Sequence, residues 1–309
     1  MRHLILSLYL LFLAVNVSAQ GLRMAILDMP ASVNSLSMGG CSLGAMPGAY
    51  IYTNPSAAFG DEIDPVVVDY DMTLVDEEQA DNMYLHSLSA SYRTGNHLLM
   101  GGVRYYAQGT IDRLVDENMQ MVPGSHRLYS YRVDLGYARQ FQRAVVYGTL
   151  GIASEQTVSQ TDAYRISLGG SFRGEIGSMP YTLGVEVRDL GLVSHLNKNH
   201  ALSPLAHCGG TISCPIGGQQ ALSLYVDGGS YLPVDGADVA SMVCGGLSYS
   251  IAGRYSLSAG AHCGDRNNFA ASGLSVRIGW LTILGSCRFG WEDGQSPMYM
   301  IGARFSSGK

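Results

Sequence analysis

Nine arginines fall where they can bind anions, because each occupies an alternate position in an otherwise apolar extended segment. A guanidinium presents N–H donors in a planar fork that matches carboxylate geometry. In residues 164–173, Tyr164, Ile166 and Leu168 share one face of a strand, whereas Arg165 and Arg173 share the other. The same alternation along the chain gives the full set of predicted inward-facing arginines: Arg104, Arg132, Arg165, Arg173, Arg188, Arg254, Arg277, Arg288 and Arg304.

Histidines and cysteines do not form a metal-binding or catalytic pattern. His207-Cys208 and His262-Cys263 are adjacent pairs, and adjacent strand residues point to opposite faces. The close ligand spacings of zinc sites are missing. No histidine lies beside a recognisable nucleophile motif. We therefore predict no metal, no cofactor and no enzymatic activity.

The elements that carry the arginines are predicted strands. Segments of about ten residues with one apolar face and one polar face are typical of transmembrane barrels, although a half-buried soluble sheet gives the same alternation. The predicted strands span residues 65–73, 84–93, 98–107, 128–140, 143–152, 162–173, 179–188, 205–213, 219–230, 239–251, 254–263, 268–279, 281–290 and 297–306.

The connections between these strands favour a barrel. Short connections such as 94–97 and 141–142 alternate with longer, more polar ones such as 108–127 and 189–204. An up-and-down barrel has this asymmetry because its two rims face different compartments, whereas a soluble sandwich has no reason for it. The prediction is an all-β fold, a single 14-stranded antiparallel transmembrane β-barrel.

The apolar faces are expected to contact lipid. A charge on the lipid face near the bilayer midplane costs about 2–4 kcal/mol, so the arginines should point inward. Only Asp134 and Glu186 are predicted as inward acids. The lumen is therefore predicted to be basic.

The N-terminus predicts export. A basic start, an apolar run from Leu4 to Val17 and small residues before Gln20 indicate a signal peptide over 1–19. No later segment is apolar for long enough to span a membrane as a helix, so insertion is expected as a barrel in a Gram-negative outer membrane. The net charge of −6 argues against a nucleic-acid partner.

Residues 20–64 are predicted to form a hatch inside the barrel formed by residues 65–309. This segment lacks alternation and is rich in turn residues. The surplus of arginines needs an anionic ligand, water or a plug as partner. We favour the plug because about eight strands already enclose a filled interior, and fourteen leave more room. By strand parity Cys244 faces the lumen and can approach Cys41 in the plug, which gives the hypothesis of a Cys41–Cys244 disulfide.

Two motifs carry a family resemblance. Ser37-Met38-Gly39-Gly40 followed by Asn54-Pro55-Ser56 resembles the N-terminal signature of PorV/PorQ-type outer-membrane proteins, within the FadL-like barrels. Val187-Arg188-Asp189-Leu190-Gly191 resembles a turn near the middle of such barrels. The resemblance implies fourteen strands, a hatch and a role in type IX secretion and surface attachment. The blander reading is that Met38, Gly39, Gly40, Asn54 and Pro55 are only the turns that fold the hatch.

Two functions follow from these observations. The main prediction is a non-enzymatic accessory of type IX secretion, with membrane lipid and secreted proteins or secretion subunits as partners. The alternative is a FadL-like channel for hydrophobic or amphipathic small molecules, in which the arginines meet a fatty-acid or detergent-like head group. Apolar residues in loop 108–127 are the predicted partner contacts, although they can equally pack on themselves: Leu114, Val115, Met119 and Met121.

Overall fold

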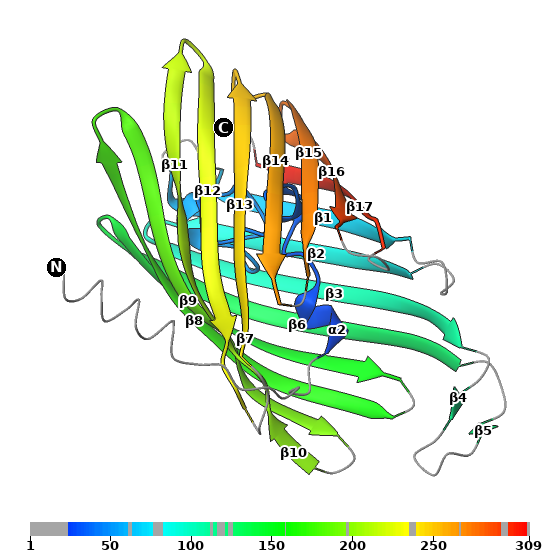
Figure 1. Ribbon diagram of the computed structural model, residues 1–309. Coiled ribbons are helices and arrows are strands. Elements are labelled where there is room, and N and C mark those ends of the chain that lie inside the picture. Colours follow the sequence, from blue (N-terminus) through cyan, green and yellow to red (C-terminus); the bar gives the residue numbers. More distant parts are fainter. Residues whose placement is uncertain are drawn as a thin grey trace.

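Fourteen antiparallel strands close into a barrel in this computed structural model, which confirms the predicted fold class (Figure 1). The structure describes residues 24–60, 64–76, 83–111, 114–115, 121–122, 126–157, 159–195, 198–234, 239–265, 267–291 and 296–307. The barrel is closed because the last strand pairs with the first, Met72 opposite Ile301. Its strands are β1 (Val66–Val75), β2 (Met83–Thr94), β3 (His97–Ile111), β6 (His126–Phe141), β7 (Ala144–Gln156), β8 (Gln160–Ile176), β9 (Met179–His195), β11 (Leu205–Gly217), β12 (Gln220–Tyr231), β13 (Ala240–Ile251), β14 (Tyr255–Gly264), β15 (Phe269–Ile278), β16 (Leu281–Gly290) and β17 (Met298–Ser306).

The short turns lie at one rim, as the connection lengths predict. They join β2 to β3, β6 to β7, β8 to β9, β11 to β12, β13 to β14 and β15 to β16. Each contains a residue with positive φ, a conformation that tight hairpins require and that glycine adopts without steric cost. These residues include Gly95, Gln142, Gly177, Gly218, Ala252 and Gly279.

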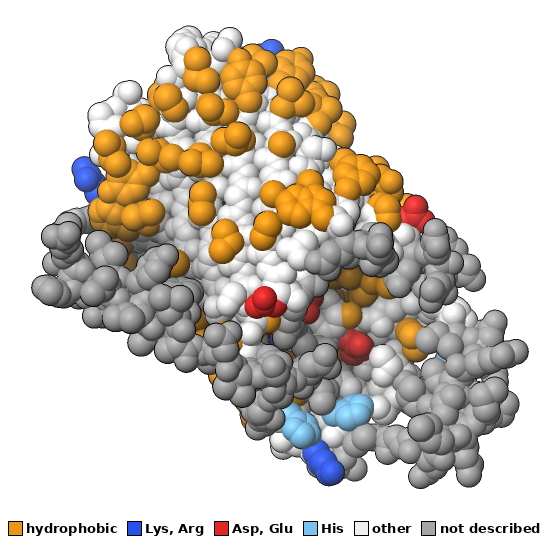
Figure 2. All heavy atoms as spheres, viewed as in Figure 1, with side chains coloured by type: hydrophobic (Ala, Val, Ile, Leu, Met, Phe, Trp, Pro, Cys, Tyr) orange, Lys and Arg blue, Asp and Glu red, His pale blue; other side chains and the backbone are white. Residues whose placement is uncertain are grey.

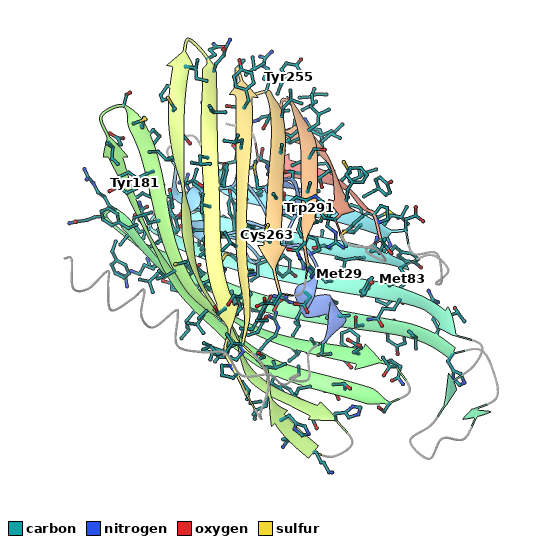
Figure 3. The ribbon with its side chains drawn as sticks, in the orientation of Figure 1. Met29, Met83, Tyr181, Tyr255, Cys263 and Trp291 are labelled. Atoms are coloured by element: carbon teal, nitrogen blue, oxygen red, sulfur yellow. The ribbon has the colours of Figure 1, made fainter. Side chains whose placement is uncertain are left out.

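The outer wall is apolar and the inner wall is polar. On β8, Tyr164 and Leu168 are 64% and 56% exposed, whereas Arg165 and Ser167 are 5% and 3% exposed. Figure 2 shows hydrophobic side chains spread over the visible outer wall. Aromatic side chains near the short turns, such as Tyr181 and Tyr255, belong to this outer surface (Figure 3). Among the described residues, no helix has the length and hydropathy of a membrane-spanning helix.

The strand boundaries differ from the prediction where the sheet leaves the regular part of the barrel. The sequence predicts a strand over 179–188 and a loop over 189–204, but β9 continues to His195. The extra strand β10 (Lys198–Ala201) pairs with it outside the fourteen barrel strands. Within loop 108–127, β4 (Leu114–Val115) and β5 (Met121–Val122) form a separate two-stranded sheet.

Residues 24–60 of the predicted hatch lie inside the barrel. They contain α2 (Ala25–Asp28), α3 (Val33–Ser37) and the 3₁₀ helix η1 (Pro55–Phe59). The Ser32 side chain caps α3 by accepting a hydrogen bond from the Ser35 N–H at 3.2 Å. The hatch is drawn in blue within the barrel in Figure 1.

Apolar hatch residues pack on inward-facing apolar residues of the strands, which fixes the hatch in place. Leu36, which is 0% exposed, belongs to a cluster with Phe269 and Met300 of the wall. A second cluster joins Met24, Ile26 and Leu27 to inward residues of β2, β3, β7, β8 and β9. A third cluster joins Tyr50, Tyr52 and Phe59 to inward residues of β3, β6 and β7. The hatch therefore contacts the wall on several sides.

Glycines in the wall allow the hatch backbone to approach β13 and β14 closely. A Cβ placed on Gly246 would lie 2.7 Å from the Met38 Cα, and one on Gly260 would lie 2.3 Å from the Met38 carbonyl carbon. Gly39 itself has φ +74°, and a Cβ there would lie 2.2 Å from the Ala261 oxygen. Side chains at these positions would push the hatch away from the wall.

We therefore expect Gly260→Ala to destabilise the protein by about 1–3 kcal/mol, the usual cost of overpacking a filled interior. Gly285→Ala is the matched control, because it also lies on a barrel strand and an added Cβ meets nothing within 4 Å. Thermal unfolding of both variants in the same detergent measures the difference. Equal melting temperatures for the two variants would contradict the close contact.

Candidate functional site

Eight of the nine predicted arginines lie on barrel strands and Arg254 lies in the turn between β13 and β14, and the nine show three levels of burial. Arg104, Arg132, Arg165 and Arg304 are buried, between 1% and 8% exposed. Three others are partly buried: Arg173, Arg188 and Arg288. The remaining two are exposed and line a cavity near the short turns: Arg254 and Arg277.

The prediction of only two inward acids is wrong. Besides Asp134 and Glu186, five further carboxylates are buried among the described residues, each between 1% and 8% exposed: Asp64, Asp69, Asp71, Asp189 and Asp227. The lumen is therefore a network of paired charges rather than a uniformly basic surface.

A chain of ion pairs runs across β6, β8 and β9. Arg132 Nε lies 2.5 Å from one oxygen of Asp134, and Arg165 donates to the other oxygen of the same carboxylate. Arg165 also donates to Asp189. All four side chains are 7% exposed or less. Each buried charge in this group thus has at least one opposite charge in contact, which offsets part of its desolvation cost.

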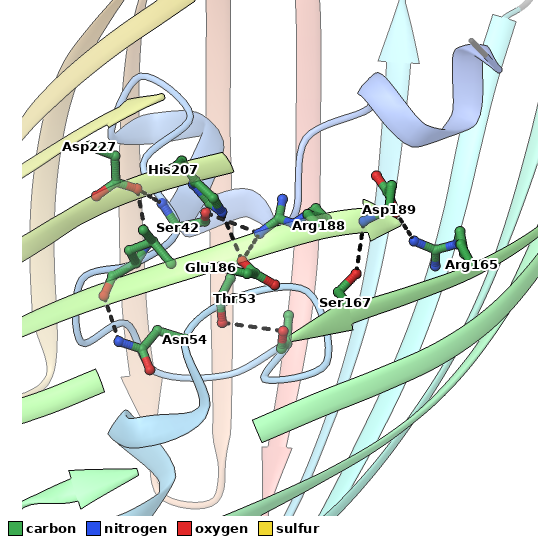
Figure 4. Close-up of polar contacts among 12 residues, drawn as sticks. Ser42, Thr53, Asn54, Arg165, Ser167, Glu186, Arg188, Asp189, His207 and Asp227 are labelled. Carbon is green, nitrogen blue, oxygen red and sulfur yellow. Dashed lines mark hydrogen bonds and ion pairs between the residues drawn. The ribbon is translucent and has the colours of Figure 1, made fainter. Parts of the chain in front are cut away.

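Asp189 reaches the lumen because β9 contains a β-bulge. Two residues of β9, Arg188 and Asp189, lie between the paired positions Ile166–Leu190 and Leu168–Val187. Asp189 has φ +61°, and its N–H donates to the Ser167 hydroxyl at 3.1 Å (Figure 4). A bulge reverses the inward and outward alternation after it. The Asp-Leu-Gly sequence, which predicted a turn, marks this bulge instead.

A second ion-pair group lies beside the bulge. Glu186 accepts from Arg188 Nη2 at 2.8 Å and contacts His207 Nε2 at 2.9 Å (Figure 4). Arg188 also donates to the Ser42 hydroxyl of the hatch at 3.3 Å. Glu186 therefore organises the cation that contacts the hatch.

An inward arginine contacts residues 24–60 through their backbone carbonyls. Arg104 Nη2 donates to the oxygens of Pro30 and Ala31 at 2.9 and 2.6 Å. Its guanidinium carbon lies 3.9 Å from the ring centroid of Tyr52, and that of Arg132 lies 4.9 Å away. Burial raises the pKa of Tyr52, so the ring between the two cations is neutral.

Acidic wall residues bind hatch N–H groups in the complementary way. Asp227 accepts hydrogen bonds from the N–H groups of Ser42 and Leu43, at 2.5 and 3.0 Å. Asp69 accepts from the Ala49 N–H at 2.8 Å and from Arg304 Nε at 2.7 Å. Wall and hatch thus satisfy each other's polar groups where water is excluded.

The two N-terminal motifs shape the hatch. Gly39 and Gly40 have φ of +74° and +94°, and their N–H groups close the end of α3 by bonding to carbonyls within it. Asn54 caps η1, which begins at Pro55, by accepting from the Ser56 N–H at 3.0 Å, and it donates to the Leu43 oxygen at 2.6 Å. Met38 packs on the wall glycines. These contacts support the reading of the motif residues as structural turns.

Three potential metal ligands, which the sequence did not single out as a site, meet where the hatch contacts β12 and β13. Their ligand atoms, from Cys41, Asp227 and Cys244, lie within 4.8 Å of one another. The expectation that Cys244 faces the lumen and can approach Cys41 agrees with this placement. Asp227 is distant from Cys41 in the sequence, so no metal-ligand spacing indicates that it joins them.

The hatch divides the lumen into two main cavities. The cavity towards the short turns has a volume of about 370 Å³ and is lined by Tyr50, Arg254 and several serines. The cavity towards the long loops has a volume of about 120 Å³ and is lined by Met29, Leu36, Phe269, Arg188 and Arg288. A space of about 20 Å³ lies beside Tyr52 and Arg104.

Several solved structures resemble this fold. No protein-family model and no curated protein sequence matches the chain. The toluene transporter TbuX of Ralstonia pickettii has a TM-score of 0.62 at 12% identity, covering 89% of this chain and 98% of that chain. The P. putida toluene transporter TodX has a TM-score of 0.61 at 10% identity, covering 91% and 98%. The monoaromatic hydrocarbon channel CymD has a TM-score of 0.62 at 12% identity, covering 91% and 98%.

This chain shares the barrel fold of these three structures. At such low identity the similarity concerns the fold alone. The three neighbours are described as transporters or channels, and none as an enzyme or a secretion protein. The predicted partner contacts in loop 108–127 stay a prediction. Met119 lies outside the described residues, and only the backbone is described for Leu114, Val115 and Met121.

We expect the chain of ion pairs across β6, β8 and β9 to contribute to the free energy of unfolding. Asp134→Asn should destabilise the protein by about 3–5 kcal/mol, because Arg132 and Arg165 would lose a buried countercharge. Asp64→Asn is the control: Asp64 is also buried, but its partner Arg277 lies 3.8 Å away with a side chain 48% exposed, so solvent weakens this pair and its loss should cost less. Denaturant unfolding in detergent compares the variants. A loss for Asp134→Asn no larger than that for Asp64→Asn would show that the buried chain is not needed.

Proposed function

We propose that this chain is a non-enzymatic outer-membrane channel for hydrophobic or amphipathic small molecules. The observation that carries the proposal is the cavity of about 120 Å³ towards the long loops, whose mixed lining combines apolar residues such as Met29, Leu36 and Phe269 with two cations, Arg188 and Arg288, and one acid, Asp28. The fold shared with transporters of toluene and other monoaromatic hydrocarbons supports the same class of solute. The division into a signal peptide over 1–19, a hatch and a barrel belongs to this proposal, and the signal peptide lies outside the described residues.

Arg288 is the cation best placed to bind an incoming anionic head group. Among the described residues it forms no ion pair, and its guanidinium carbon lies 5.0 Å from the ring centroid of Phe269. Arg188, by contrast, is already paired with Glu186. A carboxylate on Arg288 would place its apolar tail beside Leu36 and Phe269. This arrangement suits a fatty-acid-like solute.

The hatch closes the route between the two cavities, so passage requires part of it to move. Hatch residues line both: Met46 and Tyr50 face the larger cavity, whereas Met29 and Ser42 face the smaller one. In this proposal the smaller cavity is the first binding site, and the larger one, lined by serines and arginines, receives the solute after the hatch moves.

Uptake by a Gram-negative host carrying the chain in its outer membrane tests the proposal. Labelled octanoate and labelled toluene should enter faster than in cells with an empty vector. Arg288→Gln should lower octanoate uptake by roughly tenfold, because a charge-assisted hydrogen bond contributes about 1.5–3 kcal/mol. Toluene uptake should be unchanged, since toluene has no charge to bind.

Arg254→Gln is the matched control, because Arg254 is exposed at the opposite end of the lumen. It should leave the entry of both solutes close to wild type if entry is limited at the smaller cavity. Uptake of both solutes at the level of the empty vector, with the protein present and folded, would overturn the channel proposal.

The second candidate is an accessory of type IX secretion of PorV/PorQ type. The specific observation in its favour is the filled lumen, because a barrel closed by a hatch suits a scaffold that binds secreted proteins or secretion subunits through its long loops. Affinity capture from the native outer membrane, combined with unchanged solute uptake after gene deletion, would favour this function. Capture of no secretion component, together with lost uptake, would favour the channel.

A further inference from the structure

Two cysteines far apart in the sequence meet at the contact between hatch and wall. The Sγ atoms of Cys41 and Cys244 lie 3.2 Å apart, and the residues are 0% and 2% exposed. Both are free thiols in the structure as described. We propose that Cys41 and Cys244 form a disulfide that ties the hatch covalently to β13.

The surrounding contacts hold Cys41 in the position that the bond requires. On one side, the Ser42 and Leu43 N–H groups donate to Asp227. On the other side, the Gly39 oxygen lies 3.1 Å from His262 Nδ1. Because the backbone is fixed on both sides of Cys41, little further ordering is needed to bring its sulfur to Cys244.

A disulfide fits these groups better than a metal ion. The third potential ligand is Asp227, but this carboxylate already accepts two backbone hydrogen bonds. Structural zinc sites are closed by four ligands, whereas the group contains three. The neighbouring His262 contacts Cys244, but its Nδ1 also contacts the Gly39 oxygen at 3.1 Å. Two thiols in contact are the usual setting of a disulfide in an oxidising compartment, and the proposed outer-membrane location takes the chain through one.

The bond forms by thiol–disulfide exchange with an external disulfide, which is the oxidant. The thiolate of one cysteine attacks the external disulfide, forms a mixed disulfide and releases one thiol. The second cysteine then attacks the mixed disulfide, forms the Cys41–Cys244 bond and releases the second thiol. Two electrons and two protons pass to the external disulfide. Because both sulfurs are buried, exchange takes place before the hatch packs against the wall.

The other four cysteines are placed so that they remain thiols. Cys208 and Cys214 lie six residues apart on β11, about 20 Å along a strand. Cys263, labelled in Figure 3, and Cys287 lie on β14 and β16, separated by β15, so their backbones are about 10 Å apart. Bridged cysteines require Cα atoms within about 7 Å.

Such a bond restricts how the hatch can move, whatever solute the barrel admits. Residues beside Cys41 must stay at β13, so the hatch cannot leave the barrel as a unit. Any opening must displace parts of the hatch away from this tether.

Thiol counting on protein purified from membranes without reductant tests the proposal. Alkylation in denaturant should label four of the six cysteines, and all six after reduction in denaturant. Reductant applied to the folded protein should leave the count at four, because the bond is buried. Mass spectrometry of a digest should find the peptides containing Cys41 and Cys244 joined, two hydrogen atoms lighter than their sum.

Cys41→Ser gives a diagnostic result, because removing one cysteine should raise the unreduced count from four to five by freeing Cys244. Cys208→Ser, on the outer wall, is the matched control and should lower the count to three. If Cys41→Ser does not fold, the wild-type count and the joined peptides still decide. Six labelled thiols in unreduced wild-type protein overturn the proposal, and so do six thiols accompanied by one equivalent of released zinc.

Discussion

The pairing of charge inside a closed barrel is the constraint on which the rest of the structure depends. With apolar side chains covering the outer wall, the strand arginines Arg104, Arg132, Arg165 and Arg304 turn inward and are buried, so each needs a partner within the protein. Arg165 is satisfied by two acids of the wall, whereas Arg104 is satisfied by hatch carbonyls. The hatch therefore supplies hydrogen-bond acceptors that a buried arginine of the wall needs, and this contact helps to fix its position.

The sequence predicts the barrel well because alternation with a period of two is the signal that separates lipid-facing from lumenal residues. The same alternation would also have identified Asp69, Asp71 and Asp227 as inward acids. Asp189 is a different case. Its inward direction depends on a bulge, which reverses parity within β9, and no pattern of apolar and polar residues shows where a reversal occurs. Only the structure shows the bulge. Asp189 has positive φ, and two residues later a Cβ on Gly191 would lie 1.9 Å from the Tyr164 oxygen.

The hatch illustrates what sequence cannot provide. Its turn residues are visible as Met38-Gly39-Gly40 and Asn54-Pro55, and they predict a compact segment. Their partners are not visible, because Gly246 and Gly260 look like any strand glycines until Met38 is placed against them. The cavity that binds solute in our proposal is likewise formed by residues whose proximity the sequence does not show. Arg288 and Leu36 are more than two hundred residues apart, and only the folded hatch brings them to one surface.

The two sides of the hatch are attached in physically different ways, and this difference bears on how the barrel opens. Towards β12, β13 and β14 the hatch backbone contacts wall glycines directly, Asp227 holds two N–H groups, and the two cysteines meet. Towards β3 and β6 it is held by side chains, with Arg104 and Arg132 around Tyr52 and an apolar cluster that includes Tyr50 and Phe59. A long side chain can change rotamer and keep its charge paired while the backbone it binds moves away. A backbone packed on glycine has no such freedom, since it separates from the wall as soon as it moves. By this argument the hatch moves at lower cost on the arginine side, beside the space next to Tyr52 and Arg104, which shares Met29 and Arg188 with the smaller cavity.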